Sequence, residues 1–180
     1  MGVSWILLSN SKKNSKKVKN IALCGVLTTL AMIFSYIDSL ISIPIPVPGV
    51  RIGISNIAII TVLYMVGIKE AVIVNVLRIT LTSILFGNIT SFWFSIAGGI
   101  LSIVVMILLK KIDIFSMIGV SVAGGVSHNI GQIIAAVLLM ETNAIFYYLP
   151  VLLITGTVTG VVIGIVAAMV LRRLKLHSIW

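Results

Sequence analysis

A few charged and carboxamide side chains interrupt the long apolar stretches of this sequence. Arg78 lies in the middle of one stretch, with Asn75 three residues before it and Thr82 four residues after it, so the three share one helical face. A charged side chain at bilayer depth costs about 2.5 to 3.5 kcal/mol, so it is retained where water, a partner or a ligand compensates it. This pattern favours a polar cavity around Arg78. The alternative is an arginine that pairs with a carboxylate of the bundle or extends to an interface.

A second polar group lies within five consecutive positions of another apolar stretch. His128 and Gln132 are spaced i and i+4 and share a helical face, and Asn129 is adjacent to His128. An imidazole and two carboxamides can hydrogen-bond to a polar solute. The alternative is that these side chains satisfy one another inside a helix bundle. One histidine without a nearby Cys, Asp or Glu offers too few ligands for a metal site.

The third polar group surrounds a segment with three prolines, residues 44–48, which exclude regular helix. Asp38 precedes this segment, and Arg51 and Asn56 follow it. We expect the segment to cover the outer mouth of a cavity, with Arg51 available to an anion and Asp38 available to balance either arginine. The alternative is that Arg51 marks an interface and Asp38 caps a helix.

Together the three groups predict one outward-facing pocket for a small organic anion or a polar ring system. The candidate substrate-binding residues are Asp38, Arg51, Asn56, Asn75, Arg78, His128, Asn129 and Gln132. Prenyl diphosphate chemistry needs clustered carboxylates to hold magnesium, whereas the four acidic residues of this chain are scattered along it. We therefore expect no catalytic residue, no enzyme activity, no metal and no cofactor.

Six apolar stretches position these side chains. A helix that crosses a bilayer needs about 20 residues, so six spans occupy most of the 180 residues. The positive-inside rule places the lysines of residues 12–19 in the cytoplasm, and an even number of spans returns residues 172–175 to the same side. The sequence thus predicts an all-α, multi-pass protein of the cell membrane, a six-helix bundle with both termini cytoplasmic. The expected spans are approximately 21–43, 52–66, 70–86, 92–109, 114–140 and 148–171.

The composition leaves little room for another domain. The chain is 59% hydrophobic, with 13 basic and 4 acidic residues. We expect a basic cytoplasmic tail at 1–20, a membrane domain at 21–172 and a second cytoplasmic tail at 173–180. The basic residues adjoin the ends of spans, where they meet anionic lipid head groups, so the positive charge does not indicate nucleic-acid binding.

Small residues recur every four positions in the last two spans, which predicts close helix packing there. The first span has a shorter set, Ala22, Gly25 and Thr29, which either packs within the bundle or docks another protein. The rows in the last two spans are Gly119, Ala123, Ser127, Gly131 and Ala135, and Gly156, Gly160, Gly164 and Ala168.

Three longer motifs are PIPVPGVRIGISNI at residues 44–57, SIAGG at 95–99 and GVSVAGGVSHNIGQ at 119–132. These motifs resemble the Gx transporter family, often labelled heptaprenyl diphosphate synthase component I, and the resemblance covers roughly residues 20 to 172. The six-span plan also resembles the S components of energy-coupling factor vitamin transporters. This resemblance implies a solute-binding subunit that works with a transmembrane coupling protein and two ATPases. It also implies that Ala22, Gly25 and Thr29 dock the coupling protein.

The sequence therefore predicts a substrate-binding membrane subunit for the uptake of a small organic solute, anionic or similar to a vitamin or precursor. The chain has no phosphate-binding loop of its own, so a partner ATPase module must supply the energy. The alternative is a non-catalytic membrane accessory subunit of polyprenyl, or heptaprenyl, diphosphate synthesis. A stand-alone channel would need a continuous polar path, for which the second and sixth spans supply few residues.

Overall fold

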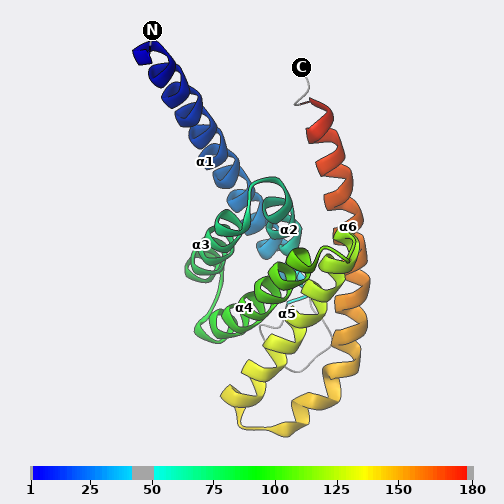
Figure 1. Ribbon diagram of the computed structural model, residues 1–180. Helices are drawn as coiled ribbons and strands as arrows, with labels where there is room; N and C mark the ends of the chain where they lie inside the picture. Colours follow the sequence, from blue (N-terminus) through cyan, green and yellow to red (C-terminus); the bar gives the residue numbers. More distant parts are fainter. Residues whose placement is uncertain (1, 42–50, 178–180) are drawn as a thin grey trace.

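The computed structural model describes residues 2–41 and 51–177, and over these residues the chain is helical (Figure 1). Four helical stretches there are long and apolar enough to cross a membrane, namely Lys17–Leu40, Ile89–Ile112, Met117–Met140 and Asn143–Arg173. The prediction of a helical membrane protein is confirmed. The elements are α1 (Gly2–Leu40), α2 (Asn56–Met65), α3 (Ile68–Phe86), α4 (Ile89–Ile112), α5 (Met117–Met140), the 3-10 helix η1 (Asn143–Tyr148) and α6 (Leu149–His177).

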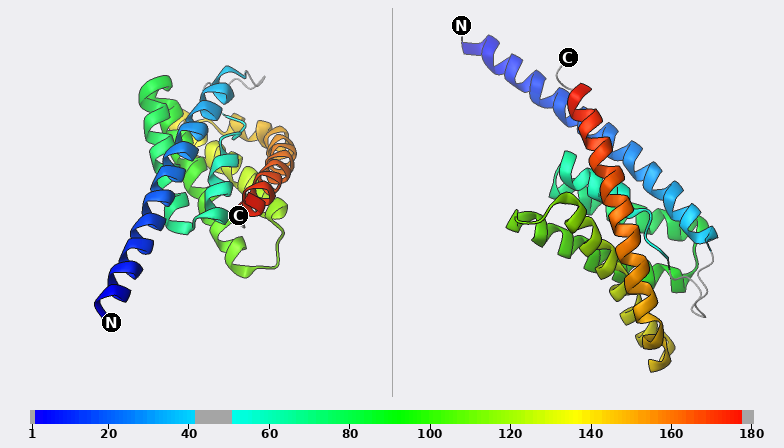
Figure 2. Two further views of the ribbon diagram at one scale, coloured as in Figure 1. Left: turned by 90° about the horizontal axis from the view of Figure 1, so that it is seen from above. Right: turned by 90° about the vertical axis from the view of Figure 1, so that its right-hand side faces the viewer.

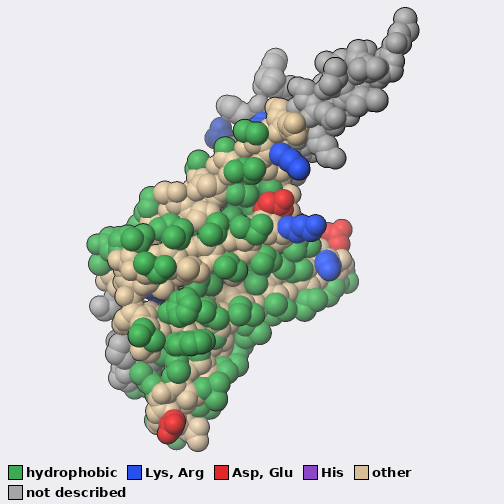
Figure 3. Space-filling view, turned by 90° about the vertical axis from the view of Figure 1, so that its left-hand side faces the viewer, with side chains coloured by type: hydrophobic (Ala, Val, Ile, Leu, Met, Phe, Trp, Pro, Cys, Tyr) green, Lys and Arg blue, Asp and Glu red, His purple; other side chains and the backbone are tan. Residues whose placement is uncertain are grey.

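Large apolar side chains cover the outside of these helices. Ile84, Ile114 and Leu138 are 74%, 81% and 73% exposed. Hydrophobic side chains cover most of the face in Figure 3, where acidic and basic groups gather toward the upper end and one acidic group lies at the bottom. Apolar surface on this scale is unfavourable in water but is not penalised by lipid. The exterior is therefore that of a protein embedded in a bilayer.

The first and last helices extend beyond the rest of the molecule at the same end. Figures 1 and 2 show the N-terminal part of α1 and the C-terminal part of α6 projecting past the shorter helices. Helix α1 begins at Gly2, so the residues expected to form a tail before position 21 continue the first helix. The two ends of the described chain therefore lie at the same end of the molecule.

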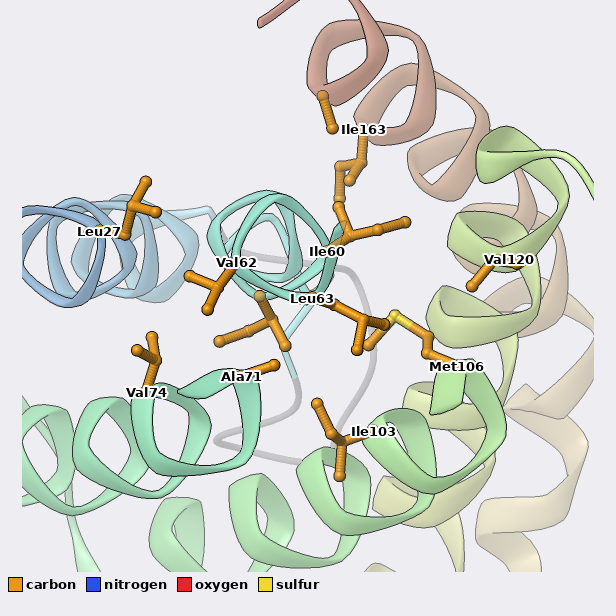
Figure 4. Packing of buried hydrophobic residues seen from close by; sticks show 12 residues of the cluster. Leu27, Ile60, Val62, Leu63, Ala71, Val74, Ile103, Met106, Val120 and Ile163 are labelled. Atoms are coloured by element: carbon orange, nitrogen blue, oxygen red, sulfur yellow. The ribbon is translucent and has the colours of Figure 1, made fainter. Parts of the chain in front are cut away.

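Helix α2 is short and central. It has 10 residues, or about 15 Å, which is about half of the hydrocarbon thickness of a bilayer. Figure 4 shows Ile60, Val62 and Leu63 of α2 among apolar side chains of neighbouring helices. The expected second span began at residue 52, whereas the helix starts at Asn56 and residues 51–55 form a turn before it. Gly53 explains this start, because its φ of +90° is a conformation that other residues rarely adopt.

A lysine of α4 holds the end of α2. The Lys110 ammonium donates to the Leu63 carbonyl oxygen and lies 4.9 Å from the centroid of the Tyr64 ring. The last carbonyl groups of a helix have no hydrogen-bond donor within the helix, and Lys110 is the donor to one of them. We expect Lys110→Met to lower the free energy of unfolding by about 1 to 2 kcal/mol, because the carbonyl loses a charged donor. Denaturation in detergent measures this, with the exposed Lys111→Met as control, and equal midpoints for the two variants would contradict it.

Glycines allow α4, α5 and α6 to approach at backbone contact. A Cβ atom added to Gly125 of α5 would lie 2.6 Å from the carbonyl oxygen of Gly156 in α6. A Cβ atom added to Gly131 would lie 2.6 Å from the carbonyl oxygen of Ala97 in α4. Small residues of α5 therefore face both neighbouring helices, the packing expected where burial of apolar surface gives little driving force.

Two glycines provide a matched test of this packing. We expect Gly131→Ala to lower the free energy of unfolding by about 2 to 3 kcal/mol, because the added methyl group meets backbone that cannot move away cheaply. Gly25→Ala should instead be neutral or stabilising by up to about 1 kcal/mol, because nothing lies within 4 Å of its added Cβ atom. Unfolding midpoints in detergent compare the two, and a loss of similar size at both positions would disprove the assigned contacts.

Candidate functional site

The turn before α2 is held by side chains from α1 and α5. The Asp38 carboxylate accepts the backbone N–H groups of Ile52, Gly53 and Ile54 at 3.0, 2.8 and 3.2 Å. The Gln132 Oε1 atom accepts the N–H group of Arg51 at 3.0 Å. Backbone at membrane depth outside a helix must find its hydrogen bonds within the protein. Asp38 and Gln132 supply them here, so these two residues position the turn.

Arg78 joins three segments of the chain. One amino group of its guanidinium donates to the Ser55 hydroxyl and lies 3.5 Å from the Ser35 hydroxyl, and the other donates to Asn75 Oδ1 at 2.9 Å. Asn75 in turn donates to the Gly99 carbonyl oxygen at 3.1 Å. Arg78 is only 3% exposed, so the interior of the bundle contains this charge. It therefore does not extend to an interface.

His128 continues the polar cluster from the side of α5. Its Nε2 atom lies 2.7 Å from the carboxamide nitrogen of Gln132. Because Gln132 Oε1 already accepts from Arg51, this nitrogen donates, and neutral His128 then carries its proton on Nδ1. The Nδ1 edge of the ring lies against Gly98 of α4, where an added Cβ atom would be 2.9 Å away. Close approach at Gly98 therefore makes room for the imidazole.

Asn129 faces a different neighbour. Its Nδ2 atom donates to the Leu152 carbonyl oxygen of α6 at 2.6 Å, and the same atom would meet a Cβ atom on Gly156 at 2.7 Å. The carboxamide thus lies in the contact between α5 and α6. Asn129 is adjacent to His128 in sequence, but its carboxamide bonds to α6 and not to the turn at residues 51–55.

Several buried polar atoms have no hydrogen-bond partner among the described residues, and some of them lie beside the turn. The unpartnered donors include Arg78 Nε and Asn56 Nδ2. Each such group costs about 1 to 3 kcal/mol, so a cluster of them needs an explanation. The complete set is Asn56 Nδ2, Arg78 Nε, Thr82 Oγ1, Ser83 Oγ, Ser102 Oγ, His128 Nδ1 and Asn129 Oδ1.

The charges of the cluster do not balance. Arg51 and Arg78 are 6% and 3% exposed, and Asp38, at 2%, is the carboxylate beside them. Two buried guanidinium groups with one carboxylate leave an excess of positive charge, and an anion would neutralise it.

The structure brings together seven of the eight predicted site residues. Asn129 is the exception, because it joins α5 to α6 instead. Ser35 and Ser55 contact Arg78 but were not among the candidates. Ser35 could have been found from its spacing, because it precedes Asp38 by three residues on one face of α1. The predicted proline segment lies within residues 42–50, outside the described part of the chain. The seven residues are Asp38, Arg51, Asn56, Asn75, Arg78, His128 and Gln132.

The predicted docking residues lie on the outside of α1. Ala22, Gly25 and Thr29 are exposed, and the Thr29 hydroxyl bonds to the Gly25 carbonyl oxygen of its own helix at 3.1 Å. Nothing in the described chain lies within 4 Å of a Cβ atom added to Gly25, so packing inside the chain does not explain the glycine. A partner on this surface stays a prediction.

The apolar exterior and the buried polar cluster define a helical membrane protein with a polar site between its helices. The family model described as heptaprenyl diphosphate synthase component I matches residues 27–170. The chain belongs to this family, and the family predicted from its motifs is confirmed. Comparisons with curated proteins and with solved structures gave no match.

Proposed function

We propose that the protein is the solute-binding membrane subunit of an uptake system for a small organic anion, with no enzymatic activity of its own. The supporting observation is the buried cluster around residues 51–56, to which α1, α3 and α5 each contribute polar side chains. Buried charges and carboxamides are expensive inside a membrane protein and mark functional sites there. The excess of guanidinium groups favours an anionic solute.

The unpartnered donors in the cluster also support a ligand. Arg78 Nε and Asn56 Nδ2 are buried donors without a hydrogen-bond partner among the described residues. A carboxylate or phosphate group that entered between them would accept these hydrogen bonds and offset the cost of burying the donors. Binding would then require the turn at residues 51–55 to move away from α5.

We propose six spans with both termini in the cytoplasm, and a partner ATPase module as the source of energy. Helix α2 and the turn before it form the shortest of these spans, and the basic ends of α1 and α6 face the cytoplasm. A transmembrane coupling protein would dock on Ala22, Gly25 and Thr29, which are exposed on α1.

A solute screen tests the proposed binding. The purified chain in lipid nanodiscs is titrated with carboxylate and phosphate metabolites, vitamins and isoprenoid precursors, and the shift in unfolding temperature is recorded. We expect an anionic solute to bind the wild type and to bind Arg78→Lys about tenfold more weakly, since lysine cannot reproduce the geometry of the guanidinium. The exposed Arg173→Lys should bind normally. A wild type that binds nothing in the panel, or an Arg78→Lys variant that binds equally well, would contradict the proposal.

Affinity purification from native membranes tests the partners. The family description names a synthase component, whereas the four acidic residues here lie at Asp38, Glu70, Asp113 and Glu141, in α1, in α3 and at the ends of α4 and α5. Uptake predicts that a membrane coupling protein and ATPases copurify with the chain. Recovery of a soluble prenyl synthase in their place would overturn this part of the proposal.

A further inference from the structure

A groove of about 660 Å³ runs between α1 and α3, away from the polar cluster. One face of each helix lines it, and the groove opens on the apolar exterior. Its lining includes Lys17, Asn20 and Cys24 from α1, and Glu70, Leu77 and Leu81 from α3.

Within the described part of the chain, nothing packs against Gly25 of the lining, whereas Cys24 and Val74 of the lining also belong to the hydrophobic core. Nothing lies within 4 Å of a Cβ atom added to Gly25, although glycine weakens a helix interior by about 1 kcal/mol relative to alanine. The Thr28 and Thr29 hydroxyls bond to carbonyl groups of their own helix, so neither hydroxyl needs a polar partner in the groove. The α1 span is also the least buried of the four long spans, at 22% against 33% to 56%. The space beside α1 is therefore shaped for an occupant from outside the chain.

The two ends of the groove differ in polarity. Lys17, Asn20 and Glu70 lie at the end near the chain termini, and the Glu70 carboxylate folds back toward Gly67 at the start of α3. Beyond this end the lining is apolar or has small, internally bonded hydroxyls, as far as Leu81. From Glu70 to Leu81 the α3 helix rises about 16 Å, which matches one leaflet, about half of a 30 Å hydrocarbon core.

We propose that this groove binds one phospholipid whose head group carries both a phosphate and a primary ammonium group. The Lys17 ammonium and the Asn20 carboxamide donate to the phosphate, and the Glu70 carboxylate accepts from the lipid ammonium. One acyl chain lies along Cys24, Leu77 and Leu81. The bound lipid comes from the leaflet on the side of the chain termini, and it fills the space that α1 leaves open against α3 in the free subunit. A coupling protein that docked on Gly25 and Thr29 would displace it.

Native mass spectrometry of the full chain tests this assignment. The protein is stripped of lipid in detergent and titrated with phosphatidylethanolamine, phosphatidylcholine or phosphatidylglycerol. We expect one phosphatidylethanolamine per chain, bound about tenfold more tightly than the other two, because phosphatidylcholine has no N–H donor and phosphatidylglycerol has no positive charge. Glu70→Gln should remove this preference, and Lys17→Gln should weaken all three lipids. The control is Lys69→Gln, which removes a neighbouring exposed charge that does not line the groove.

A second pair of variants tests the path of the acyl chain. Gly25→Leu should block the groove without disturbing the fold and reduce bound lipid about tenfold, whereas Val26→Leu, whose side chain is 66% exposed and not in the lining, should have no effect. Equal binding of the three lipids together with unchanged binding in Gly25→Leu would overturn the proposal. The proposal would also be overturned if the free chain bound none of the three lipids and the groove were covered only in a complex with a partner subunit. Neither outcome depends on whether the polar cluster binds a solute.

Discussion

Replacing Arg78 with methionine is expected to abolish solute binding and to lower the free energy of unfolding by about 3 kcal/mol. Methionine fills much of the same volume but leaves the Ser55 hydroxyl and Asn75 Oδ1 without their donor. A hydrogen bond to a charged group contributes about 1.5 to 3 kcal/mol, and each buried group left unsatisfied costs about 1 to 3 kcal/mol. Removal of the charge itself returns part of that loss, because burying a guanidinium is costly.

Unfolding of the detergent-solubilised protein by denaturant measures the stability change, and the solute screen measures binding. Arg78→Lys separates the two effects, because lysine keeps a positive charge and one donor and should retain most of the stability while binding more weakly. Arg173→Met, at an exposed position near the end of α6, is the matched control. An Arg78→Met protein as stable as the wild type would show that the hydrogen bonds to α1, α3 and the turn are not formed.

Helical spacing predicted much of the polar cluster correctly. Asn75 and Arg78 share one face of α3 and are hydrogen-bonded to each other, and His128 and Gln132 share one face of α5 and are also bonded. The rule that places residues i, i+3 and i+4 together depends only on the helix. It therefore holds for pairs on one helix, whichever helices pack around them.

The partners of Asp38 could not be predicted in this way. Its carboxylate binds backbone N–H groups 14 to 16 residues away, and a backbone group gives no signal in the side-chain sequence. Asn129 was misplaced for a related reason: adjacent residues on a helix point about 100° apart, so Asn129 faces α6 while His128 faces α4. Which neighbour each face meets is decided by tertiary packing.

The start of α2 shows the same limit of sequence reasoning. The apolar stretch predicted from the sequence begins at residue 52, so a hydropathy argument places the start of the span there. The structure starts it at Asn56 because Gly53 has a positive φ and because Asp38 accepts three N–H groups of the turn. The Asp38 carboxylate of α1 thus accepts backbone N–H groups that would have bonded to carbonyl groups if α2 extended further toward its N-terminus. The position of Arg51 and Ser55 depends on this replacement, and so does the shape of the cluster.

Asp38→Asn is accordingly expected to loosen the turn at residues 52–54 while leaving the rest of the bundle folded. Asparagine keeps one of the two carboxylate oxygens and places an N–H₂ group opposite the remaining backbone donors, so one or two of the three hydrogen bonds are lost. Each is assisted by the charge, and the expected loss of stability is about 2 to 3 kcal/mol. Asp38→Ala removes all three acceptor contacts and should lose more.

Hydrogen exchange measured by mass spectrometry gives a readout specific to this role. A peptide that covers Ile52 to Ile54 should exchange fastest in Asp38→Ala, more slowly in Asp38→Asn and slowest in the wild type, while peptides of α5 and α6 should keep their protection. Asp113→Asn makes the same substitution at the exposed end of α4, where asparagine suits the left-handed backbone, and should change neither exchange nor stability. If Asp38 instead served only to balance a guanidinium, Asp38→Asn would leave the turn protected. If Asp38→Asn both binds solute more weakly and exchanges faster at the turn, the weaker binding is explained by the displacement of Arg51 and Ser55. A lost contact between Asp38 and the solute is then not needed to explain it.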